Sequence, residues 1–116
     1  MTLGMKNLMG AVGGARGRLH QDLANTLPDL LGFFKPTLLV LDGIRVLTAN
    51  GPTGGSLSDV QRKDTVIASA DPVAGDAAGA VLFGLKPQQV GCIVEAAARG
   101  FGKIDFESLG PKRLEM

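Results

Sequence analysis

Two aspartates follow short apolar runs, where they could bind a ligand. Asp42 is near the end of the run at residues 37–43, and Asp71 follows the run at residues 65–69, whose last residue is Ser69. Because ligands of open α/β sheets bind beyond the carboxyl ends of strands, we expect these three polar side chains to converge. Asp42 and Asp71 are therefore candidate ligands of a hard cation such as Mg²⁺, and together with Ser69 they are candidate ligand-binding residues.

The segment between the two runs, residues 48–64, is rich in glycine, serine, asparagine and aspartate and is predicted to be a long loop. Its glycines Gly51 and Gly54 could offer backbone amides or carbonyls to the same ligand. A structural role for the two aspartates stays open: Asp71 would only cap the helix that starts at Pro72, and Asp42 would only fix a turn.

The first motif, at residues 6–20, combines four glycines with basic side chains and with His20, the single histidine of the chain. Its glycines lack the spacing of dinucleotide-binding and nucleotide-binding loops. Lys6 could still meet a small anion through charge-assisted hydrogen bonds. His20 is a candidate general base or ligand, and the alternative is a surface or capping residue.

Asp76 is the second catalytic candidate, because it lies one turn inside an alanine-rich and glycine-rich helix. A carboxylate on the packed face of such a helix needs a partner, which predicts a functional role or a buried hydrogen-bond network, and the alternative is a side chain that faces solvent. Cys92, between Val90 and Ile93, is predicted to be a small core residue. A single cysteine cannot hold an iron–sulfur cluster, so none is expected in this chain.

The elements that must position these residues follow an α/β order. An amphipathic helix spans residues 19–34 with a kink or restart near Thr26, because Pro28 interrupts it. Two further helices start at Pro72 and Pro87, and residues 103–110 could form a short edge strand. We predict a small parallel or mixed sheet of two to three strands covered by three to four helices, and the thin sheet indicates a partial domain.

The composition indicates one soluble domain over residues 1–116, with a flexible lead-in at residues 1–18 and a frayed tail at residues 110–116. The formal net charge of +1 and the absence of tryptophan and tyrosine argue against nucleic acid as a partner. No apolar run is long enough for a membrane span or a signal peptide. We therefore expect a cytoplasmic protein without a membrane or nucleic-acid partner.

Five segments in this order carry a resemblance over nearly the whole chain: "KNLMG", "LLVLDGI", "NGPTGG", "IASADPVAGDAAGA" and "AAARGFGKID". They resemble the carboxy-terminal half of the prokaryotic domain of unknown function 362 family. The resemblance implies an association with ferredoxin-type 4Fe-4S modules and a redox-linked role. It carries over Lys6, Asn7, Gly10, His20, Asp42, Gly43, Gly51, Pro52, Gly54, Ser69, Asp71, Pro72 and Asp76.

This chain lacks the preceding α/β half and the cysteine motifs that the resemblance implies. We therefore expect an α/β domain of a redox-associated protein, which binds a small anionic ligand or a divalent cation at its strand ends. The alternative is a non-catalytic interaction module that forms a homodimer or completes a larger domain. Catalysis is left open.

Overall fold

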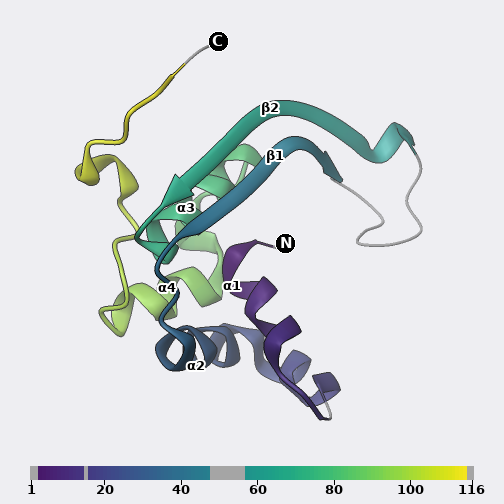
Figure 1. Cartoon of the computed structure of the whole chain (residues 1–116), viewed down its shortest axis with the longest axis vertical. Coiled ribbons are helices and arrows are strands. Elements are labelled where there is room, and N and C mark those ends of the chain that lie inside the picture. Colours follow the sequence, from purple (N-terminus) through teal and green to yellow (C-terminus); the bar gives the residue numbers. More distant parts are fainter. Residues whose placement is uncertain (1–2, 15, 48–56, 115–116) are drawn as a thin grey trace.

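The computed structural model describes residues 3–14, 16–47 and 57–114. The described elements are the helices α1 (Gly4–Asn7), α2 (Leu23–Phe34), α3 (Pro72–Leu82) and α4 (Gly91–Ala98), the strands β1 (Leu39–Leu47) and β2 (Val60–Ser69), and the short 3₁₀ segments η1 (Leu8–Ala11), η2 (Arg16–Asp22), η3 (Leu57–Asp59), η4 (Pro87–Gln89) and η5 (Phe106–Leu109). Figure 1 shows the two long strands side by side, with the helices gathered toward one end of the pair. The predicted α/β class is confirmed, with two strands and four α-helices in the described residues.

The two strands are antiparallel, so the prediction of a parallel or mixed sheet is wrong. Leu39 lies opposite Ser69 and Leu47 lies opposite Val60, with an irregularity between Gly43 and Arg45. Parallel neighbours need a crossover connection, usually an α-helix, and the described residues between β1 and β2 contain only the short 3₁₀ segment η3. An antiparallel pair needs only a turn.

The extents of the strands also differ from the prediction. Strand β2 begins at Val60 and so includes residues 60–64 of the predicted polar loop, and β1 continues beyond the predicted run to Leu47. No strand forms at residues 103–110, where the structure has the 3₁₀ segment η5, so the edge-strand prediction is wrong.

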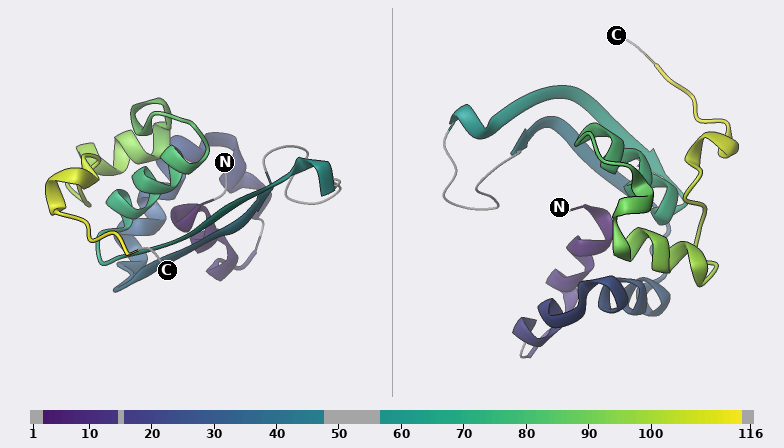
Figure 2. Two further views of the ribbon diagram at one scale, coloured as in Figure 1. Left: turned by 90° about the horizontal axis from the view of Figure 1, so that it is seen from above. Right: turned by 180° about the vertical axis from the view of Figure 1, so that it is seen from behind.

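Helix α3 is buried on several sides and packs against the inner face of the sheet. Val73, Ala77 and Ala80 are fully enclosed, and α3 contacts both strands, α1 and α4. In the view from above in Figure 2, α3 and α4 lie on one side of the sheet. The glycines Gly75 and Gly79 face the leucine side chains of β1, so this helix approaches the sheet closely. Small residues at these positions make the approach possible.

Both ends of α3 lie where the capping residues of the sequence predict them. The side chain of Asp71 accepts a hydrogen bond from the backbone N–H of Ala74, which is the predicted N-cap, and Pro72 occupies the first turn. Gly84 follows the helix with a φ of 74°, a conformation that glycine adopts without strain.

Helix α2 begins later than predicted. The chain leaves helical geometry at Asp22, whose φ is −148°, and the preceding residues form the 3₁₀ segment η2. Pro28 lies buried inside α2, so the predicted break near Thr26 is displaced toward the N-terminus. Arg99 joins α2 to α4, because its guanidinium contacts Asp29 at 2.5 Å and Glu95 at 2.9 Å.

The first residues differ from the predicted flexible lead-in. They form α1 and η1, and the side chains of Met5 and Met9 are buried in the core. A spacing of four residues places both methionines on one side of these helical turns. Residues 110–114 form no helix or strand.

No helix within the described ranges is long and apolar enough to cross a membrane.

Replacing Gly75 by alanine tests the close approach of α3 and the sheet. A Cβ atom there would lie 2.3 Å from Leu39 Cδ2 and 3.3 Å from Ser69 Cβ. Overpacking costs about 1–3 kcal/mol, which exceeds the gain in helix propensity of up to about 1 kcal/mol. We expect Gly75→Ala to lower the free energy of unfolding, measured by urea denaturation. Gly10→Ala is the control, since a Cβ atom there has no neighbour within 4 Å, and an equal effect of both changes would contradict the packing argument.

Candidate functional site

The carboxylate of Asp76 joins α3 to the N-terminal helix α1. Its side chain is only 2% exposed, and its two oxygens accept hydrogen bonds from the backbone N–H groups of Gly4 at 2.8 Å and Met5 at 2.9 Å. A Cβ atom on Gly4 would lie 3.0 Å from Asp76 Oδ1 and 2.0 Å from Leu39 Cδ1. Asp76 therefore lies in a buried hydrogen-bond network, and the alternative of a solvent-facing side chain is wrong.

Burial raises the pKa of Asp76 above its ordinary value, although the two backbone N–H groups act in the opposite direction. Burial also raises the pKa of the nearby Cys92 thiol, and the Asp76 carboxylate adds to that shift. Cys92 is half-buried and packs against the core, as predicted. A raised pKa keeps the thiol protonated at neutral pH, so Cys92 lacks the thiolate character of a nucleophile.

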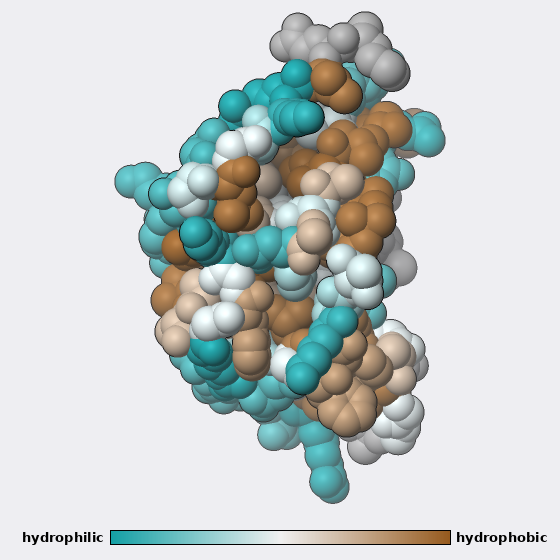
Figure 3. All heavy atoms as spheres, turned by 60° about the vertical axis from the view of Figure 1, so that its left-hand side comes forward, coloured by the Kyte–Doolittle hydropathy of each residue, from teal (hydrophilic) through white to brown (hydrophobic). Residues whose placement is uncertain are grey.

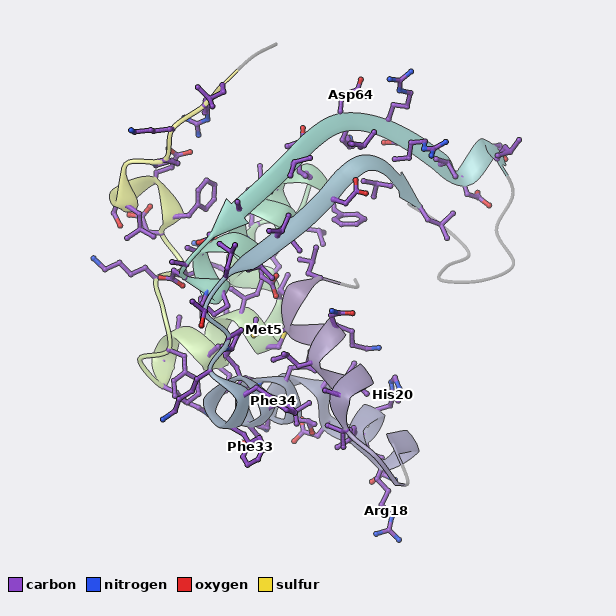
Figure 4. The ribbon with its side chains drawn as sticks, viewed as in Figure 1. Met5, Arg18, His20, Phe33, Phe34 and Asp64 are labelled. Carbon is purple, nitrogen blue, oxygen red and sulfur yellow. The ribbon has the colours of Figure 1, made fainter. Side chains whose placement is uncertain are left out.

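His20 does not share a site with Asp76. It is exposed on η2, whereas both Asp76 oxygens face the start of α1 in the interior. Figure 4 shows His20 and Arg18 at the helical end of the molecule, well away from Asp64 on the sheet. The two predicted catalytic candidates are therefore not brought together.

Asp71 and Ser69 form a capping arrangement after β2. Asp71 Oδ1 accepts from the N–H of Ala74 at 3.0 Å, and Oδ2 accepts from the N–H of Lys103 at 2.9 Å. The Ser69 hydroxyl donates to the carbonyl of Asp71 and accepts from its N–H. Both carboxylate oxygens of Asp71 thus bind backbone groups, and the predicted capping role is confirmed.

Asp42 lies apart from Asp71, so the structure does not bring the two aspartates of the predicted strand-end site together. Asp42 is within β1 opposite Val66, whereas Asp71 follows Ser69, which pairs with Leu39 at the other end of the ladder. Three residues of a strand span roughly 10 Å. The antiparallel direction of the pair causes this separation, since only parallel strands bring both carboxyl ends to one edge.

No group of three metal-ligating side chains (His, Cys, Asp or Glu) gathers in the described parts of the chain. The predicted loop residues Gly51 and Gly54, with Pro52, lie outside the described residues. The divalent cation and the small anion stay predictions from the sequence.

An open hollow of about 580 Å³ lies between α1 and β1 and brings together two of the predicted residues, Asn7 and Asp42. Its other walls are mostly apolar and include Leu8 and Leu31. Asp42 is exposed there, and its Oδ1 accepts from the N–H of Ile44. Lys6 is half-buried and is not among the described residues that line the hollow. An apolar hollow with one carboxylate fits an uncharged or cationic group better than an anion.

Comparison with known families gives one result. Residues 1–81 match the family described as domain of unknown function (DUF362), which is more than half of the chain. The chain belongs to the DUF362 family. No curated protein and no solved structure matches it. The matched residues of this DUF362 chain include α1, both strands and nearly all of α3, and therefore both the Asp76 network and the hollow.

The backbone partners of the Asp71 and Asp76 carboxylates were not predicted from the sequence. The N–H groups of Gly4 and Met5 carry no side-chain signal, and their residues precede the segments that were singled out. Gly102 was also missed: a Cβ atom there would lie 2.0 Å from Asp71 Oδ1. The one available signal was Asp76 itself, a carboxylate on a helix of otherwise small, uncharged residues.

Replacing Asp76 by asparagine tests the buried network. Asparagine has one acceptor oxygen, so one of the two N–H groups loses its partner at a cost of about 1–3 kcal/mol. We expect Asp76→Asn to lower the free energy of unfolding by this amount in urea denaturation. The exposed Asp64→Asn is the control and should change it by less than about 0.5 kcal/mol.

The pH dependence of the same variant tests the pKa of Asp76. A folded-state pKa above the ordinary value of 3.8 means that the folded chain binds the proton more tightly. Wild-type stability therefore falls, relative to Asp76→Asn, as pH rises from the ordinary to the raised pKa. We expect the cost of the substitution to shrink over this window in urea denaturations at several pH values. A cost that grows with pH would show that the two N–H groups outweigh burial.

Replacing Asp71 by alanine separates capping from metal binding. Loss of the cap costs about 0.5–2 kcal/mol, so we expect a lower midpoint of thermal unfolding. Because both carboxylate oxygens bind backbone N–H groups, millimolar Mg²⁺ should shift wild type and Asp71→Ala equally. Stabilisation of the wild type alone would instead identify Asp71 as a metal ligand.

Proposed function

We propose that this DUF362 chain is a non-catalytic interaction module, which associates with a second copy through the outer face of its sheet. The observation that carries the proposal is the exposure of apolar side chains on the face opposite α3. Leu38, Val40 and Val66 are 62%, 57% and 58% exposed.

These side chains are neighbours across the ladder. Val40 pairs with Ala68, and Val66 pairs with Asp42 on the same face. All four are exposed, whereas Leu39, Leu41 and Ile67 alternate with them on the partly buried side. Sheets of soluble proteins commonly bury one face and leave a polar one in water. Here the outer face is largely apolar, which is typical of an interaction surface.

The distribution of apolar surface elsewhere is less concentrated. Figure 3 shows, on the side it presents, apolar areas interrupted by hydrophilic ones. Other exposed apolar side chains, such as Phe33 on α2 and Val81 on α3, lie on separate elements. Backbone hydrogen bonds hold these neighbours of β1 and β2 side by side, which gives one continuous surface that a second copy can match.

Replacing Val66 by lysine tests this proposal. We expect the mass of the wild type, measured by light scattering, to rise above 12.0 kDa with concentration. Val66→Lys places a charge on this apolar face, so its self-association should be at least tenfold weaker. Its thermal unfolding in dilute solution should match the wild type, because the side chain is already exposed.

Val81→Lys is the matched control, since Val81 is exposed on α3 rather than on the sheet. It should associate as the wild type does. A wild type that stays at 12.0 kDa up to millimolar concentration would contradict the proposal, and so would equal weakening by both lysine variants.

A further inference from the structure

We infer that the hollow between α1 and β1 binds an extended polypeptide segment, which adds to the free edge of β1 as a third strand. The added strand would pair with the edge of β1, whereas the second copy would cover the outer face of the sheet, although Leu38, Val40 and Asp42 border both surfaces. Either can therefore fail without the other.

The edge of β1 that faces away from β2 is unpaired in the described residues. The sheet has two strands, and apart from this ladder no backbone group of residues 38–42 forms a hydrogen bond with a described residue. Figures 1 and 2 place α1 on the side of β1 that lies away from β2. An unpaired edge offers alternate N–H and C=O groups to an incoming strand.

The hollow lies along this edge. All five residues from 38 to 42 line it, although successive side chains of a strand point to opposite faces. A hollow that contacts every residue of such a run is bounded by the edge of the strand, not by one face alone. Four steps along a strand span roughly 13 Å, which is the length of about five residues of an added strand.

The residues that line the hollow determine which polypeptide segment could bind there. Leu3, Leu8 and Leu31 oppose the strand across the hollow, so apolar side chains of the segment would pack there. Asp42 supplies the single charged side chain of the described lining, and its Oδ2 accepts no hydrogen bond from the described residues. The matching segment is extended, with apolar side chains at alternate positions and one lysine or arginine opposite Asp42. Main-chain hydrogen bonds then supply affinity, and the side-chain contacts supply specificity.

A synthetic probe tests the inference on the full chain. The probe is a dye-labelled seven-residue peptide of alternating valine and threonine with lysine at its centre, and fluorescence anisotropy measures its binding. Two further versions carry N-methyl groups on either the odd or the even backbone nitrogens. An added strand points only one of these sets toward β1, so we expect one version to bind at least tenfold more weakly and the other within about twofold of the parent.

Substitutions locate the binding. Asp42→Asn keeps an acceptor for the Ile44 N–H but loses the charge, so it should weaken the lysine peptide about two- to fivefold, as for an exposed ion pair. Asp64→Asn, on β2 and outside the hollow, should leave binding unchanged. A version of the peptide with threonine in place of its lysine should bind Val66→Lys as it binds the wild type, because Val66 lies opposite Asp42 but outside the hollow, and this separates the edge from the outer face. No binding of the parent peptide at millimolar concentration, or equal binding of the two methylated versions, would overturn the inference.

Discussion

The fold depends on the close packing of α3, because this helix contacts the sheet, α1 and α4 at once. Its side chains are small, and Gly75 and Gly79 let the leucines of β1 approach its backbone. Asp76 extends the same contact to α1 through two backbone N–H groups. The packed side of α3 is closed in this way, and Val81 near its C-terminal end is exposed. The two proposed interaction surfaces lie instead on the far side of the sheet and along β1.

Local signals in the sequence predicted the ends of α3 well, whereas α2 and α4 begin later than predicted and α1 was not predicted. Asp71 and Pro72 fix the start of α3, and Gly84 follows its end, because capping and turn preferences depend only on neighbouring residues. The strand direction was missed because two apolar runs look alike in parallel and antiparallel sheets. The first half of β2 was predicted to be a loop because it contains the charged residues Arg62 and Asp64, although charges are common on strands at the edge of a sheet.

The candidate site was only partly predictable, because its geometry depends on the direction of the two strands. Asn7 and Asp42 were singled out and do meet at one hollow, but Asp42 and Asp71 were paired on the assumption of parallel strands. Asp71 and Asp76 bind backbone N–H groups of distant segments, and no residue type in those segments predicts these contacts. The exposure of the apolar side chains of Val40 and Val66 was also not predictable, since the sequence alone does not say which face of the sheet a helix covers.

Binding of an added strand requires that β1 has one paired edge and one free edge. Amide hydrogen exchange of the isolated chain, followed by NMR in dilute solution, measures this directly. Successive N–H groups of an antiparallel strand point to opposite edges, so protection along residues 39–43 should alternate, with slow exchange toward β2 and fast exchange toward the hollow. Uniformly slow exchange over these residues would show that the second edge is already covered and would contradict the account.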